Sequence, residues 1–107
     1  MRMVKVLTLD DYAKAHARAS SSLKIWQAIV QSASWSCFND VRATFGSADM
    51  VRLPNGRSIV VFNIAGNEYR LITAIHFTPQ NPRRGRVYIR EFLTHAEYDK
   101  NDWKERH

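Results

Sequence analysis

The fold of this chain is decided by the stretch Arg57-Ser-Ile-Val-Val-Phe-Asn-Ile-Ala-Gly-Asn-Glu-Tyr-Arg-Leu-Ile-Thr-Ala-Ile-His-Phe77 and by Val87-Tyr-Ile-Arg-Glu-Phe-Leu-Thr-His-Ala-Glu-Tyr-Asp-Lys100, which follows a basic loop. Runs of apolar, β-branched and aromatic residues separated by turn residues predict strands at residues 58–64, 68–77 and 86–93. Residues 65–67 form a tight hairpin turn between the first two strands. Residues 78–85, which contain two prolines, form an arginine-bearing loop before the third.

Helices are predicted both before and after these strands along the chain. Thr94 and Glu97 have the capping-box spacing, so a short C-terminal helix begins at His95. In the N-terminal half, Thr8 is the expected N-cap of a helix over residues 9–19, and the serines at 20–22 break it and cap a second helix. A helical turn is expected near residues 39–45, and residues 3–7 alternate like a short edge strand. The sequence therefore predicts an α+β fold, a small antiparallel sheet packed against an N-terminal helical hairpin.

Length and composition limit the class of protein. A chain of 107 residues is expected to form one domain over residues 1–107. No apolar run approaches the roughly 18 residues of a membrane span, so we expect a soluble cytoplasmic protein that does not contact a membrane. The single cysteine, Cys37, excludes an internal disulfide and a cysteine-rich zinc site.

Positive charge is concentrated in the second half of the chain. The net charge is +6 and the pI is near 9.9; between Arg52 and Arg90 there are seven arginines and one acid, Glu68. Such a surface attracts phosphate backbones or an acidic protein, although a merely solvated basic surface gives the same count. The preference for arginine favours bidentate phosphate contacts.

Four residues could form a site for RNA cleavage. If the strand register sets arginine opposite arginine, Arg70 and Arg90 project from one open face, which costs free energy unless an anion binds between them. His95 and Tyr98 lie on one side of the expected final helix. Histidine, phenol and guanidinium groups suit metal-free cleavage, in which a base deprotonates the 2′-hydroxyl and an acid protonates the leaving 5′-oxygen. The sequence has no carboxylate cluster for two metals and no glycine-rich phosphate loop, so we expect no cofactor and no metal.

Each of these residues also has a structural interpretation. The two arginines could pair with Glu68, Glu91 or C-terminal acids, and Asn67 could be a turn residue that tolerates positive φ. His95 could be a helix-start residue with a satisfied side chain, and Tyr98 could be a core residue. From the spacing alone, the chain is a basic domain that binds nucleic acid.

The chain resembles the HigB toxins of type II toxin–antitoxin systems, within the wider RelE-like group of mRNA interferases. Three blocks carry the resemblance, in the family's order and spacing: Val-Phe-Asn-Ile-Ala-Gly-Asn-Glu-Tyr-Arg-Leu-Ile at 61–72, Val-Tyr-Ile-Arg at 87–90 and Thr-His-Ala-Glu-Tyr-Asp at 94–99. The resemblance implies a compact RelE-like fold and an endoribonuclease that cuts mRNA, commonly in the ribosomal A site, and so inhibits translation. It also implies a HigA-like helix-turn-helix antitoxin as partner.

The resemblance marks Asn67, Arg70, Arg90, His95 and Tyr98 by their positions in these blocks. We interpret Arg70, Arg90, His95 and Tyr98 as catalytic, with the identity of the base left open between His95 and Tyr98. The expected RNA-binding residues are Arg57, Asn67, Arg83, Arg84, Arg86 and Lys100. Two other functions compete with the nuclease: a non-catalytic RNA- or ribosome-binding module that modulates translation, and an interaction protein whose basic face serves only an acidic partner.

Overall fold

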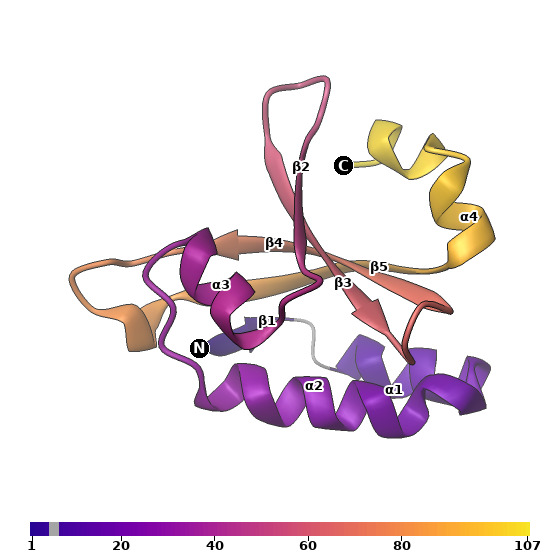
Figure 1. Ribbon diagram of the computed structural model, residues 1–107, viewed down its shortest axis with the longest axis horizontal. Coiled ribbons are helices and arrows are strands. Elements are labelled where there is room, and N and C mark those ends of the chain that lie inside the picture. The colour runs from indigo at the N-terminus through magenta and orange to yellow at the C-terminus, as the bar shows by residue number, and fades with distance from the viewer. Residues whose placement is uncertain (5–6) are drawn as a thin grey trace.

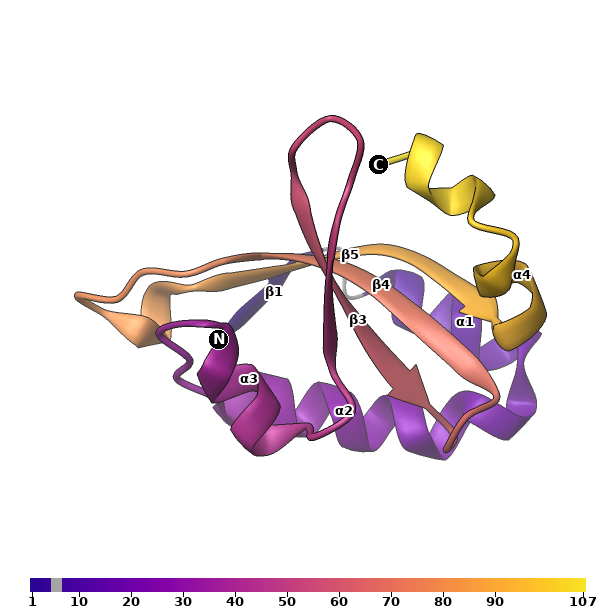
Figure 2. The ribbon, with the colours of Figure 1, turned by 45° about the horizontal axis from the view of Figure 1, so that its top comes forward.

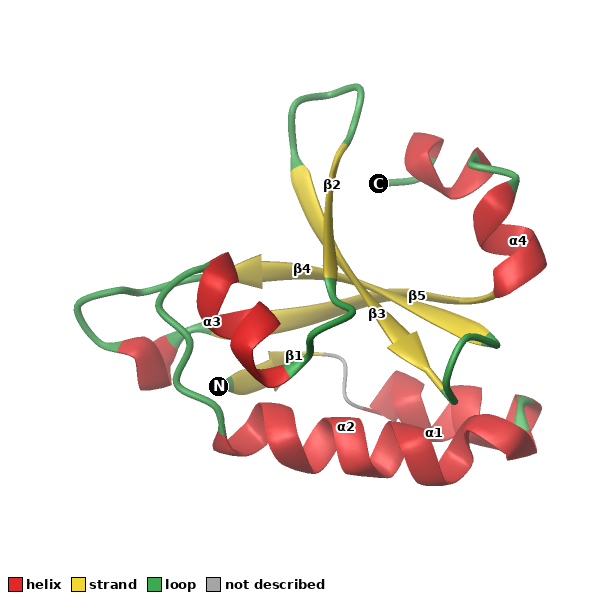
Figure 3. Cartoon of the chain, viewed as in Figure 1, coloured by secondary structure: helices red, strands yellow, loops and turns green. Residues whose placement is uncertain are grey.

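A five-stranded sheet is the centre of the computed structural model, which describes residues 1–4 and 7–107. Within these residues the strands are β1 (Arg2–Val4), β2 (Asp49–Arg52), β3 (Ser58–Ile64), β4 (Tyr69–His76) and β5 (Arg86–Thr94). Their order is β1-β5-β4-β3-β2, and every pairing is antiparallel except that of β1 with β5. The α+β class is confirmed, but the sheet is mixed rather than purely antiparallel (Figure 3).

The helices lie on opposite sides of this sheet. The helices α1 (Leu7–Ala15) and α2 (Ser20–Ser32) contact each other and cover one face, as expected of the N-terminal hairpin, and α3 (Phe38–Thr44) follows them (Figure 1). The helix α4 (His95–Asp99) and a 3₁₀ helix, Asp102–Glu105, lie beyond the other face. Figure 2 shows α1 and α2 below the strands and the C-terminal helices above their right-hand end. None of the described helices has the length and apolar character that a membrane span requires.

Two apolar clusters pack on the two faces of the sheet. The larger, between the sheet and α1 and α2, contains Trp26, Phe62 and Leu71, all at most 2% exposed. The smaller lies under the C-terminal helices and is built around Trp103, which is fully buried against Ile72 and Leu93. Alternation along each strand separates the two sets, because successive side chains point to opposite faces. Burial on both sides explains why the sequence shows continuous apolar runs in β3 and β4.

Several helix boundaries differ from the expected ones. Helix α1 begins at Leu7, so Thr8 lies inside it rather than before it, and a 3₁₀ turn at 17–19 separates it from α2. The serines at 20–22 form the first turn of α2, whose N-cap is Ala19. The edge strand expected at 3–7 is β1, which spans Arg2–Val4; residues 5 and 6 lie outside the described residues.

The hairpin register also differs from the conditional prediction. Arg70 pairs with Leu93, and Arg90 has no partner because a β-bulge opposite Ile72 and Thr73 inserts it as an extra residue. The bulge shifts the alternation of β5: Val87, Ile89 and Phe92 belong to the helix-facing cluster, whereas Leu93 belongs to the opposite one. Arg70 and Arg90 are therefore not cross-strand neighbours.

Candidate active site

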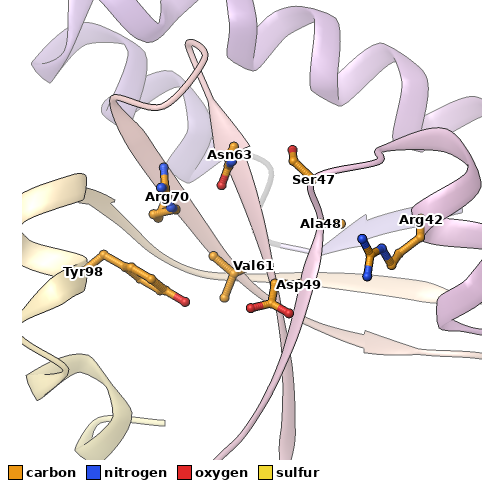
Figure 4. Close-up of a pocket in the computed structure, with 8 residues that line it drawn as sticks. All are labelled: Arg42, Ser47, Ala48, Asp49, Val61, Asn63, Arg70 and Tyr98. Carbon is orange, nitrogen blue, oxygen red and sulfur yellow. The ribbon is translucent and has the colours of Figure 1, made fainter.

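A polar pocket opens on the face of the sheet that α1 and α2 leave uncovered, between α4 and β2. Val61 and Asn63 on β3 form its floor with Arg70 on β4, and Tyr98 closes one side from α4. The other side comes from the segment that leads from α3 into β2. Figure 4 shows the Tyr98 hydroxyl pointing toward Val61 and Asp49. The complete lining is Arg42, Ser47, Ala48, Asp49, Val61, Asn63, Arg70 and Tyr98.

Arg70 is a charged side chain that is almost completely buried, with 8% of its surface exposed. Its Nη1 donates to the carbonyl oxygens of Asn67 (3.2 Å) and Tyr69 (3.1 Å), and its Nη2 donates to Asn67 Oδ1 at 2.7 Å. All three acceptors are neutral. The hairpin turn between β3 and β4 thus fixes the direction of the guanidinium. The positive φ values of this turn are at Ala65 and Gly66, so Asn67 serves as an acceptor for Arg70 rather than as the left-handed residue.

No carboxylate pairs with Arg70 in the part of the chain that the structure describes. Glu68, the acid nearest in sequence, lies 3.6 Å from Arg18. Glu91 accepts from Arg106 and His107 instead. Burying a cation costs free energy unless a counter-charge accompanies it, a cost that an anion bound in the pocket would lower.

Tyr98 is held in place by its own helix and by the C-terminal segment. The predicted capping box is present: Glu97 N donates to Thr94 Oγ1 (3.2 Å), and Thr94 N donates to Glu97 Oε1 (2.9 Å). The backbone hydrogen bond from Thr94 holds the pKa of Glu97 below its ordinary value. Trp103 stacks on the Tyr98 ring at 5.2 Å, and its Nε1 donates to the Tyr98 carbonyl oxygen at 3.0 Å.

The environment of Tyr98 keeps its hydroxyl protonated. Burial raises the pKa of Tyr98, as do the charges of Asp49 and Asp99, while Arg70 acts in the opposite direction. The ordinary value is 10.0, so the phenol is a hydrogen-bond and proton donor at neutral pH.

Asp49 and Arg42 are pocket residues that the sequence analysis missed. Asp49 is the first residue of β2, an edge strand that pairs with β3 in the register Asp49↔Val61. Arg42 is in the last turn of α3, with Nη2 donating to the Gly46 carbonyl oxygen at 3.2 Å. In residues 47–53 the alternation of apolar and polar residues breaks at Met50-Val51, and the pairing of Asp49 with β3 is what reveals this side of the pocket. Among the described residues no group of three or more His, Cys, Asp or Glu side chains is arranged to hold a metal ion.

The other predicted catalytic residues do not line the pocket. His95 is on the first turn of α4, where Nε2 lies 3.2 Å from Asp99 Oδ2 and the backbone N–H donates to the Glu68 carbonyl oxygen. Arg90 is exposed, with its guanidinium carbon 6.0 Å from the centre of the Tyr88 ring. Of the four, the pocket brings together Arg70 and Tyr98, whose guanidinium carbon and ring centre are 5.6 Å apart.

The residues expected to bind RNA are exposed at separate places on the surface. Arg57 follows the β2–β3 turn, Asn67 is in the β3–β4 turn, and Lys100 follows α4. Arg83 and Arg84 belong to a 3₁₀ helix, Pro82–Arg84, inside the predicted loop, and Arg86 begins β5. Asn67 is the one of these that contacts a pocket residue, through Arg70.

The sequence matches known proteins over most of its length. The chain is 27% identical over 99 residues to the mRNA interferase toxin HigB of Escherichia coli K12, covering 92% of this chain and 88% of that protein. The same values hold for proteins named mRNA interferase HigB from Escherichia coli O157:H7 and Shigella flexneri. The model of the HigB toxin family, described as the RelE-like toxic component of a toxin–antitoxin system, matches residues 19–101. The chain therefore belongs to the HigB family of RelE-like toxins.

Proposed function

We propose that this toxin is an endoribonuclease that cuts messenger RNA through attack of a 2′-hydroxyl, without a metal ion. The observation that carries the proposal is a buried guanidinium, Arg70, that has no carboxylate partner among the described residues and lies beside a protonated phenol, Tyr98. The names of the three relatives, all mRNA interferases, support the same reaction and substrate.

The phosphate at the cut is held by Arg70 and approached by Arg42 from the opposite side of the pocket. Arg70 is fixed before the substrate arrives, because its hydrogen bonds to the β3–β4 turn set its orientation. A charge held in place stabilises the dianionic phosphorane without reorganising during the reaction. Arg42 is exposed and adds positive charge at the pocket mouth.

Asp49 and Tyr98 divide the proton transfers. The Asp49 carboxylate takes the proton of the 2′-hydroxyl, the 2′-oxygen forms a bond to phosphorus, and the bond from phosphorus to the 5′-oxygen breaks. Tyr98 gives its proton to that 5′-oxygen, and Arg70 stabilises the phenolate that forms. The products are a 2′,3′-cyclic phosphate and a 5′-hydroxyl end. We assign the acid to Tyr98 rather than to His95 because Tyr98 lines the pocket, whereas His95 faces Asp99.

The proposed partners follow from the family. A toxic component of a toxin–antitoxin system has an antitoxin and, here, an RNA substrate; we propose a HigA-like helix-turn-helix protein as the antitoxin. We also propose that cutting takes place in the ribosomal A site, in the cytoplasm. The exposed residues Arg57, Asn67, Arg83, Arg84, Arg86 and Lys100 are then available to the RNA around the cut.

The test is 5′-end mapping of a defined mRNA incubated with the purified protein, with and without translating ribosomes. We expect in-frame cuts that depend on ribosomes, carry 5′-hydroxyl ends, and disappear in the Tyr98→Phe and Arg70→Met variants. If the mRNA stays intact in every reaction while translation still falls, the protein is a non-catalytic RNA- or ribosome-binding module instead. If the cuts carry 5′-phosphate ends, attack by the 2′-hydroxyl is the wrong mechanism.

A further inference from the structure

Three basic side chains lie in a row across the end of the sheet that is farthest from Tyr98. Arg2 of β1 pairs with Arg86 of β5, and Arg86 pairs with His76 of β4. All three are exposed. Val87, the next residue of β5, belongs to the cluster under α1 and α2. Because adjacent residues of a strand point to opposite faces, the row lies on the face that these helices leave open.

This arrangement is unfavourable for the protein alone. Like charges at directly opposed strand positions destabilise a sheet. No carboxylate pairs with Arg2, Arg86 or His76 within the described residues, where Glu68 is engaged by Arg18 and Glu91 by Arg106. Arg83 and Arg84 add to the charge, because Arg2 N donates to the carbonyl oxygen of Gly85, directly after them (3.0 Å). An anion would relieve the repulsion between Arg2 and Arg86, and the His76 ring lies beside them as a hydrogen-bonding group.

An aromatic side chain interrupts the charges. Tyr88 follows Arg86 on the same face of β5, opposite Ala74 and Val4, and is half-buried. Arg90 lies over its ring at 6.0 Å. The β-bulge leaves Arg90 without a cross-strand partner, which frees this residue from the ladder. A tyrosine beside arginines on an open sheet offers a stacking surface for a base next to contacts for its phosphates.

We propose that this surface binds single-stranded RNA. It consists of Arg2, His76, Arg86, Tyr88 and Arg90, and we call it the basic sheet face. The inference rests on the proposed function and extends it, because the face and the pocket share one side of the sheet. Along β4, His76 is six residues from Arg70, or about 20 Å at the usual rise of a strand. An RNA strand whose cut phosphate lies on Arg70 passes beside the apolar cluster around Trp103, which covers Ile72, before it reaches Tyr88 and Arg86.

RNA fits this face better than an acidic protein does. Arginines with an interleaved aromatic ring match the repeating phosphate and base of a nucleic acid strand. An acidic peptide would use the charges but not the ring. On this basis Arg90, which the sequence placed among the catalytic residues, is a binding residue outside the pocket.

The experiment measures affinity for non-cleavable 2′-O-methyl RNAs of about 4 and about 16 nucleotides, the range that one single-strand-binding domain covers. The first variant combines Arg2→Gln with Arg86→Gln, and the second is Tyr88→Leu. The matched control combines Lys14→Gln with Lys24→Gln, two exposed cations on α1 and α2. Thermal unfolding of each protein checks that the fold is retained.

We expect the arginine variant to lose affinity for the longer RNA and to reduce the slope of log affinity against log salt by about 1.4, or 0.7 for each lost phosphate contact. Tyr88→Leu loses at least about fivefold in affinity with the slope unchanged, because stacking releases no counterions. Neither variant changes affinity for the short RNA, which fills only the pocket. The lysine control binds both RNAs like the wild type.

Equal binding of the longer RNA by both variants and the wild type would overturn the proposal. So would unchanged RNA binding together with lost affinity for polyglutamate, which would identify the face as a protein contact. The source of the RNA is settled by repeating the measurement with vacant ribosomes and with free message. Lost affinity for either vacant ribosomes or free message supports the basic sheet face, because the phosphates of both RNAs have the same chemistry. The nuclease is tested separately: if the wild type fails to cut ordinary mRNA but the arginine variant still loses affinity, the proposed function fails and the basic sheet face remains.

Discussion

The guanidinium carbon of Arg70 lies 5.6 Å from the centre of the Tyr98 ring, on which Trp103 also stacks at 5.2 Å. A buried cation is therefore in contact with the phenol proposed as the acid, and the phenol is supported by an indole that is itself fully buried. Cation–π contacts of this kind strengthen when they are removed from water. The arrangement couples the charge that binds the phosphate to the group that protonates the leaving oxygen.

The first prediction separates stability from activity at Arg70. The Arg70→Met variant removes a buried charge that pairs with no carboxylate in residues 1–4 and 7–107, so its midpoint of thermal unfolding should equal or exceed that of the wild type. Cleavage should fall by about 10²–10³, the usual cost of losing a group that stabilises the transition state. Calorimetry and end mapping measure the two effects. Arg52→Met, the same change at an exposed arginine of β2, should change neither the unfolding midpoint nor the cleavage rate; a strongly destabilised Arg70→Met would contradict our account of the pocket.

The second prediction concerns the pH dependence of cleavage. Only protonated Tyr98 acts as an acid, and its pKa is raised above 10.0, so the rate should not decline on the alkaline side until the pH exceeds that value. Tyr98→Phe keeps the ring on Trp103 but removes the proton, and we expect the cleavage rate to fall by about 10²–10⁴ with RNA affinity retained. Single-turnover rates across pH provide the measurement. A decline of the cleavage rate near neutral pH would indicate a histidine as the acid and would contradict the assignment of Tyr98.

The third prediction links Asp49 to Tyr98 directly. Since the Asp49 charge raises the pKa of Tyr98, Asp49→Asn should lower that pKa, and cleavage should fall because the proposed base is lost. NMR titration of labelled tyrosine rings follows the shift. Asp99→Asn serves as the comparison and should produce a smaller downward shift, because Asp99 contributes less to the raised pKa. No change in Asp49→Asn would mean that the two side chains do not share the pocket in solution.

The fourth prediction concerns Glu91, which holds the C-terminal segment through its contacts with Arg106 and His107. Burial opposes ionisation of Glu91, but hydrogen bonds from Arg106 and His107 outweigh it, so the pKa of Glu91 lies below its ordinary value of 4.5. A carboxyl whose pKa is lower in the folded state contributes stability that is present above pH 4.5 and is lost as the pH falls through the folded value. Glu91→Gln should therefore unfold at a lower temperature than the wild type at neutral pH. The difference should disappear in acid, and a constant difference at every pH would show that packing rather than charge is responsible.

The sequence predicted the elements whose signals are local. The strands β3, β4 and β5 begin and end within one residue of the expected positions, because apolar runs and turn residues mark both ends. The capping box at Thr94 and Glu97 was also predicted correctly, since two side chains three residues apart are enough to form it.

Two features of the site could not be read from local signals. Strand β2 is short, lies at the sheet edge and exposes three of its four residues, so it owes its structure to pairing with β3 rather than to its own composition. The bulge at Arg90 depends on how β4 and β5 align, and the residue type at that position does not predict it. Asp49 was missed for the first reason, and Arg90 was set beside Arg70 for the second.

The bulge also shifts the alternation of side chains along β5, so that the residues before it and after it follow different patterns. Before it, Val87 and Ile89 face the helices; after it, Phe92 does, while Glu91 is left free to anchor the C-terminal segment. One residue inserted or deleted between Arg86 and Thr94 would turn Phe92 away from the helices and drive Glu91 or Leu93 toward them. The same change within residues 78–85 would only alter a loop. In homologous or designed versions of this scaffold, the number of residues in β5 is thus as strongly constrained as the identity of its buried side chains.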